Sequence, residues 1–274
     1  MSDYSVSEHR MAESLPDMPR YKALCRVLAS RLMLAAFLVA LLSNLLSVVS
    51  LIFSYQSNFS YYAAMLSDSY GRTAAAADHA IFFAVLAVIV LLMLGSIVLE
   101  FLPQWLLISR ARHGRLIGRK PFTVLRTCCI LLVVAMSINL FFSLILFSAL
   151  EINILQIIVL AMQLVFYGAL VRMLGVQRDI AMWGSASRHV SYKATAFIMA
   201  LQLIPTLAAL LLTVLQFVNP AYFKLTAYAS TGTLDFVMAV IITLISLLST
   251  VLYALTILRA GKEFAAVEPE LMEF

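Results

Sequence analysis

Six long stretches of apolar residues alternate with short polar segments along the chain. They cover residues 32–54, 80–102, 128–149, 152–171, 195–217 and 236–258. Each stretch has the roughly 20 residues that an α-helix needs to cross about 30 Å of hydrocarbon. A backbone in lipid must satisfy its own hydrogen bonds, which favours helices. The pattern therefore predicts an all-α membrane bundle of about six transmembrane helices over residues 32–258, with tails at 1–31 and 259–274.

Composition supports the same fold class. Of the 274 residues, 63% are hydrophobic and 12% are charged, whereas soluble domains have about 45–50% apolar and about 25% charged residues. The net charge of +5 would by itself suggest a nucleic-acid partner. Basic residues that flank apolar spans are the ordinary mark of cytoplasmic loops, however. We therefore expect the lipid bilayer as a partner, and no nucleic acid.

The distribution of basic residues predicts the orientation of the spans. Of the 19 Lys and Arg residues, all except Arg72 and Lys224 fall in the two tails or in the loops after the second and fourth spans. An excess of Lys and Arg marks the cytoplasmic side of a membrane protein. The chain is therefore predicted to have both termini in the cytoplasm, most plausibly in a bacterial cytoplasmic membrane.

Four amide side chains lie inside the predicted spans. Asn44, Asn139 and Gln163 fall near mid-depth, and Gln202 falls closer to the cytoplasmic side. Because an amide in hydrocarbon needs a partner, we expect these side chains to face one another, with contacts worth about 0.6 kcal/mol each on average. The favoured interpretation is that they hold helices together, and the alternative is a polar binding site.

Two stripes of hydroxyl-bearing side chains repeat at helical spacing. The stripe in the first span is Ser43, Ser47 and Ser50, and the stripe in the sixth span is Thr243, Ser246, Thr250 and Tyr253. Small residues let helix backbones approach closely. These two helix faces are predicted either to pack together or to line one polar cleft.

Ionisable residues and proline mark two further positions. Glu100 is the acid nearest to the interior of a span, and we expect it to anchor the helix end, for example by pairing with Arg110 or Arg112, rather than to act in function. Pro205 follows Gln202 by three residues inside the fifth span. Since proline removes a helical hydrogen bond, a kink and a candidate hinge are predicted there.

Two segments on the cytoplasmic side combine apolar and basic residues. Residues 11–30 and residues 176–192 are each interpreted as an amphipathic element along the membrane surface, with plain interfacial loops as the favoured alternative. Five basic residues of the loop after the second span form a candidate contact for a cytoplasmic partner. They are Arg110, Arg112, Arg115, Arg119 and Lys120.

Signatures of catalysis and of cofactor binding are missing from the sequence. There is no phosphate-binding loop, no HExxH zinc motif and no paired-carboxylate site. The cysteines, Cys25, Cys128 and Cys129, are expected to be reduced thiols. We therefore expect no cofactor, no metal and no enzyme activity. The first hypothesis is a non-catalytic accessory, assembly or regulatory membrane component, whose partner is another membrane protein.

The alternative hypothesis is a permease subunit. A chain of 274 residues with six predicted spans and cytoplasmic termini resembles the membrane subunit of an ABC-2-type exporter. The resemblance concerns topology and size, and it implies a separate cytoplasmic ATPase as partner. The basic loop between the second and third spans would then contact that ATPase.

Overall fold

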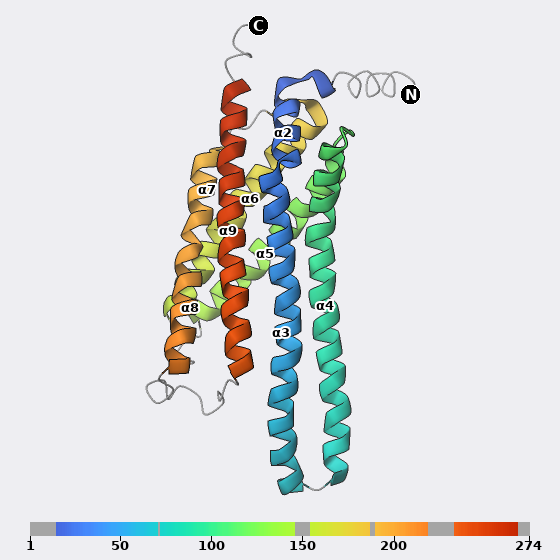
Figure 1. The fold of residues 1–274 in the computed structure, drawn as a ribbon, viewed down its shortest axis with the longest axis vertical. Helices are drawn as coiled ribbons and strands as arrows, with labels where there is room; N and C mark the ends of the chain where they lie inside the picture. Colours follow the sequence, from blue (N-terminus) through green and yellow to red (C-terminus); the bar gives the residue numbers. More distant parts are fainter. Residues whose placement is uncertain (1–14, 71, 146–153, 187–189, 219–232, 268–274) are drawn as a thin grey trace. The chain divides into compact units, whose positions relative to one another are not determined.

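The structure is a computed structural model that describes residues 15–70, 72–145, 154–186, 190–218 and 233–267. All regular structure in these ranges is helical (Figure 1). The elements are η1 (Leu15–Asp17), α2 (Pro19–Ala29), α3 (Arg31–Tyr70), α4 (Arg72–Arg112), α5 (Arg119–Ile145), α6 (Ile154–Trp183), α7 (Tyr192–Leu201), α8 (Leu203–Val218) and α9 (Thr233–Val267).

Six helical segments are long and apolar enough to cross a membrane. They are Arg31–Ser54, Phe83–Arg112, Arg119–Phe142, Ile157–Trp183, Tyr192–Leu215 and Phe236–Val267. Most of their apolar side chains point outward: Leu91 and Leu92 of α4, for example, are 67% and 69% exposed. Exposure of such an apolar surface to water is unfavourable in free energy, whereas its contact with lipid is not. The predicted six apolar helices are therefore confirmed, and the chain is consistent with a multi-pass membrane protein.

Several helices extend beyond the predicted ends of the spans. The second span was predicted to end at residue 102, but α4 continues through Pro103 to Arg112. In the same way α5 begins at Arg119 instead of residue 128. A hydropathy pattern detects only the apolar part of a helix, whereas polar residues can continue the same helix outside it. One proline removes a single backbone hydrogen bond, which α4 tolerates.

The chain divides into two compact units. Unit 1 comprises Met1–Leu38, Leu99–Pro205 and Leu248–Phe274, and unit 2 comprises Val39–Val98 and Thr206–Leu247. The parts of unit 1 come from the beginning, the middle and the end of the chain. Residues far apart in sequence therefore meet within it.

The core of unit 1 forms around α2. Pro19 stands at the start of this helix, where its missing N–H costs nothing. Tyr21, Leu24 and Leu28 are buried on one side of it. They join an apolar core with residues from four other helices, Leu107, Phe122, Ile180 and Phe264. Residues 11–30, for which interfacial loops were the favoured interpretation, contain the helix α2, whose apolar side packs against protein. Its position at a membrane surface stays a prediction.

Ser30 ends α2 and begins α3. Its backbone is extended, with φ −64° and ψ 148°, and its side-chain oxygen accepts a hydrogen bond from Met33 N at 3.1 Å. This is the geometry of an N-cap. Farther along unit 1, α5 packs along α6, and α6 also contacts α2 and α7. The third and fourth apolar helices are therefore neighbours within unit 1.

Unit 2 contains the other parts of α3, α4, α8 and α9. The rings of Phe217 in α8 and Phe236 in α9 stack, with centroids 3.9 Å apart and planes at 10°. This contact joins the two helices on either side of residues 219–232. Lys224, which the orientation argument uses, lies outside the described residues, as do the tails 1–14 and 268–274.

Candidate functional site

The five basic residues lie around the short connection between α4 and α5, with Arg110 and Arg112 at the end of α4, Arg115 in the connection, and Arg119 and Lys120 at the start of α5. Gly114 has a φ of 64°, and Arg115 N donates to Arg110 O at 2.9 Å. This is a left-handed cap of the kind that ends many helices, and it favours glycine. Three residues later Ile117 is buried, and its N–H donates to the Tyr21 hydroxyl at 2.7 Å. The connection is thereby fixed against α2.

The five basic residues predicted as a partner contact are all exposed. Arg112 Nε donates to Ala29 O at 3.4 Å, and Arg119 lies 3.8 Å from the sulfur of Met182. None of the five forms an ion pair within the described ranges, where the salt bridges involve other residues. We call this set the basic segment: Arg110, Arg112, Arg115, Arg119 and Lys120. It forms a positive surface that the described residues leave unneutralised.

A shallow cavity of about 250 Å³ lies between α2 and the basic segment. Lys22, Arg26 and Arg115 line it together with Tyr21 and Cys25. Burial raises the pKa of the Cys25 thiol, and a hydrogen bond with Tyr21 partly offsets this increase. Burial also raises the pKa of Tyr21, against the lowering effect of its bond with Ile117. Both side chains are therefore neutral at pH 7. Of the three cations, Lys22 lies 3.5 Å from Asp17 and Arg26 lies 3.8 Å from Glu263. Arg115 is therefore the one without an ion pair in the described part of the chain.

The predicted amide layer is divided between the two units. In unit 2, Asn44 Nδ2 donates to Ala40 O of its own helix at 3.0 Å. In unit 1, Gln202 Nε2 donates to Met162 O at 3.0 Å and so joins the α7–α8 junction to α6. Gln163, next to Met162, is half-buried, and Asn139 is exposed on α5. Only the Gln202 bond is shown to connect two helices, and a shared amide site stays a prediction.

The hydroxyl stripes form mostly local hydrogen bonds. Ser47 Oγ donates to Ser43 O at 2.9 Å, and Thr243 Oγ1 donates to Ala239 O at 2.7 Å. Tyr253 is the exception, because its hydroxyl donates to Gln104 Oε1 of α4 at 2.8 Å. This bond joins two helices of unit 1 whose residues are 149 positions apart in the sequence. The predicted contact between the two stripes stays a prediction.

Three titratable side chains from other helices lie within electrostatic range of Glu100. Its carboxyl group interacts electrostatically with the side chains of Cys129, Tyr167 and Tyr253, which come from α5, α6 and α9. Within the described ranges Glu100 forms no ion pair with Arg110 or Arg112, which is the pairing that we expected. Glu100 is exposed at the surface of unit 1. Sequence reasoning missed these neighbours because they lie on separate helices.

The break in the fifth span lies where proline predicts it. α7 ends at Leu201, Gln202 follows with φ −65° and ψ −15°, and α8 begins at Leu203. Pro205 has no N–H to donate to Leu201 O. The interruption agrees with the predicted kink, and a hinge at this point stays a prediction.

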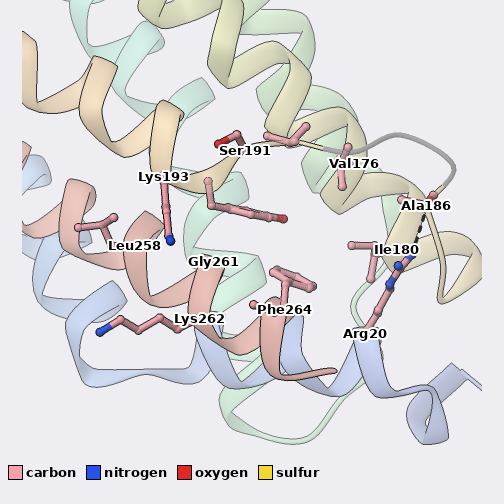
Figure 2. A pocket seen from close by; sticks show the side chains of 13 residues that line it. Arg20, Val176, Ile180, Ala186, Ser191, Lys193, Leu258, Gly261, Lys262 and Phe264 are labelled. Carbon is pink, nitrogen blue, oxygen red and sulfur yellow. Dashed lines mark hydrogen bonds between the residues drawn. The ribbon is translucent and has the colours of Figure 1, made fainter. Parts of the chain in front are cut away.

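A second cavity, of about 420 Å³, lies within unit 1 (Figure 2). Its lining includes three basic residues from three helices, Arg20 of α2, Lys193 of α7 and Lys262 of α9. None of the described residues that line it is acidic. In the sequence these three residues entered only the argument on orientation, since nothing local predicts that they surround one cavity.

The described ranges contain no group of side chains that could bind a metal ion. No three His, Cys, Asp or Glu side chains there are grouped as a metal site requires. Cys25, Cys128 and Cys129 are free thiols that are each half-buried.

Comparison with known proteins does not assign the chain to a family. No family model, no curated protein and no solved structure matches the chain.

Proposed function

We propose that this protein is a non-catalytic multi-pass membrane component that binds an acidic surface of a partner protein through its basic segment. The observation that carries the proposal is the hydrogen bond from Ile117 N to the Tyr21 hydroxyl. It fixes the connection between α4 and α5 against α2, so the basic side chains around it project from a supported backbone.

The charge of the basic segment supports a binding role. Five exposed cations lie within 11 residues of the sequence. They form no ion pair in the described part of the chain. The adjoining cavity is also lined by Lys22 and Arg26, whose charges are paired with Asp17 and Glu263. Opposite charge on a partner would accelerate association and fix the orientation of docking.

The proposed location follows from the same charges. We assign the basic segment and both termini to the cytoplasmic side, because basic residues are retained on that side during insertion. A bacterial cytoplasmic membrane is the proposed setting. The partner is then another membrane protein with an acidic cytoplasmic surface, in an accessory, assembly or regulatory complex.

A second candidate function is that of a permease subunit driven by a separate ATPase. The contact between α2 and the basic segment favours it, because the ATPase would then meet a supported lead-in helix and loop. Besides the Tyr21–Ile117 bond, Arg112 reaches the end of α2 at Ala29. The partner's identity separates the two functions.

The test is purification from native membranes in a gentle detergent, followed by mass spectrometry of the proteins that accompany the chain. The variant replaces three residues of the basic segment: Arg110→Gln, Arg115→Gln and Lys120→Gln. The matched control replaces three other exposed arginines, Arg31→Gln, Arg172→Gln and Arg259→Gln, and so has the same change in charge.

The proposal predicts a stoichiometric partner that the variant loses and the control retains. A membrane protein as that partner supports the accessory role, and an ATPase supports the permease role. Recovery of the chain without any partner would contradict the proposal. So would a partner that the basic-segment variant still retains in full.

A further inference from the structure

We propose that the cavity between α2, α6, α7 and α9 binds the phosphate headgroup of an anionic lipid. The binding group is a phosphate ester, and the source that we assign to it is the membrane rather than a free phosphate compound. This site is distinct from the basic segment, with which it shares no residue. It can therefore be tested independently of the proposed function.

The charge of the cavity favours an anion. Arg20, Lys193 and Lys262 all line it, and Figure 2 shows the Lys193 side chain extending from α7 toward Leu258 and Gly261 of α9. The nearest acid in sequence is Glu263, which does not line the cavity. It lies 3.8 Å from Arg26 and from Arg259, so its charge is already paired with other arginines.

Two residues that line the cavity carry donors without good acceptors. The Tyr192 hydroxyl is buried and has no hydrogen-bond partner in the part of the chain that the structure describes. It lies within electrostatic range of Arg20. Arg20 itself donates to Ala186 O across a long 3.4 Å (Figure 2). Buried polar groups are normally satisfied. A phosphate oxygen would accept from the hydroxyl and the guanidinium together.

The beginning of α7 adds a third favourable contribution. Ser191 caps this helix of 10 residues, and its side chain accepts a hydrogen bond from Ala194 N. Ser191, Tyr192 and Lys193 all line the cavity. Because the N-terminus of a helix carries partial positive charge and free N–H groups, it stabilises an anion placed beside it.

The walls and the position of the cavity favour a lipid over a free anion. Val176, Ile180 and Phe264 supply apolar surface, which would contact the glycerol and the first methylene groups of a lipid. Tyr192 and Leu258 lie within two of the candidate membrane spans, Tyr192–Leu215 and Phe236–Val267. A basic pocket between membrane helices on the cytoplasmic side is a typical site for an anionic headgroup.

The shape of the cavity depends on a close contact of α9 with Tyr192. The Tyr192 ring stacks on Phe264, with centroids 5.2 Å apart and planes at 12°. A Cβ atom at Gly261 would lie only 2.9 Å from the Tyr192 Cβ. Glycine at this position therefore allows α9 to lie close to Tyr192 at the wall of the cavity.

The experiment measures lipid retention by the full chain. The protein is reconstituted in vesicles of phosphatidylcholine alone or in an equal mixture with phosphatidylglycerol, extracted, and analysed by native mass spectrometry. The test variant is Lys193→Gln with Lys262→Gln, and the matched control is Arg31→Gln with Arg172→Gln, two exposed arginines that line neither cavity. We expect the test variant to retain phosphatidylglycerol about 30-fold less well than the wild type, since each of the two basic residues near an anionic lipid contributes about 1 kcal/mol. The control should bind as the wild type does.

Two further measurements test the role of the Tyr192 hydroxyl and distinguish a lipid headgroup from free phosphate. Tyr192→Phe keeps the ring stack and removes only the hydroxyl, so it should weaken retention severalfold even if the lysine variant does not fold. Inorganic phosphate is added to the protein in phosphatidylcholine alone, with its melting temperature as the readout. A melting temperature raised by phosphate without retention of phosphatidylglycerol would overturn the lipid assignment. Equal losses in the test variant and in the control would overturn the site, because they would indicate diffuse charge attraction only.

Discussion

A single phenol hydroxyl connects α2 to the loop that supports the basic segment. Tyr21 is 4% exposed, and its hydroxyl accepts from Ile117 N at 2.7 Å. Tyr21→Phe leaves that buried N–H without a partner, which costs about 1–3 kcal/mol. We expect a lower melting temperature in detergent and faster proteolysis within residues 113–118.

The control for this change is Ser137→Ala, which also removes one hydroxyl. Ser137 is exposed, and its Oγ donates only to Val133 O of its own helix, at 2.7 Å. Its melting temperature should stay close to that of the wild type. If both variants melt alike, the Tyr21–Ile117 bond does not fix the loop.

The reactivity of Cys25 gives a second residue-scale prediction. Burial raises the pKa of its thiol, so the reactive thiolate is scarcer at a given pH than for an ordinary cysteine. In a Cys128→Ser, Cys129→Ser background, alkylation should be slow at pH 8 and should still accelerate about tenfold per pH unit above the usual cysteine pKa of about 8.5. A rate that levels off near that ordinary value would show that Cys25 is not buried against Tyr21.

At the level of helices, Gly261 permits the close approach of α9 to Tyr192 at the start of α7. In Gly261→Ala the new Cβ would lie 2.9 Å from the Tyr192 Cβ, a clash that no flexible side-chain end relieves. Overpacking of this kind costs about 1–3 kcal/mol. Thermal unfolding in detergent should show the loss.

Gly168→Ala in α6 is the matched control for the same substitution. Nothing lies within 4 Å of a Cβ at Gly168, and alanine is a better helix former than glycine by up to about 1 kcal/mol. This variant should melt at the same temperature or higher. A Gly261→Ala protein as stable as the control would mean that α9 and Tyr192 are farther apart than the structure has them.

The helices were largely predictable from sequence, because hydropathy is a local property. All six apolar stretches are helical where the structure describes them, and the break near Pro205 follows from the chemistry of proline alone. The ends were less predictable. α4 runs through Pro103 to Arg112 because helix formation continues into polar sequence that no hydropathy pattern reports.

At the scale of the whole molecule, the candidate sites depend on contacts between distant residues, and sequence predicted them poorly. Tyr253 stood out in a hydroxyl stripe, but its partner Gln104 did not. From the sequence alone, the basic residues Arg20, Lys193 and Lys262 could only be counted for the orientation of the spans. The fold shows that all three line one cavity. The basic segment is the exception, because its residues are close in sequence and their exposure follows from their charge.

Both proposals require the basic segment and the cavity to lie on the cytoplasmic side, so the orientation of the chain is the claim to test first. A single cysteine is introduced as Arg115→Cys in a background that lacks Cys25, Cys128 and Cys129. The control is Asn58→Cys in the same background, which we expect to lie on the external side of the membrane. Intact cells are then treated with a membrane-impermeant maleimide. We predict that position 58 is labelled and that position 115 is labelled only after the membrane is opened. Labelling of position 115 from outside intact cells would contradict the assigned orientation and, with it, a cytoplasmic partner.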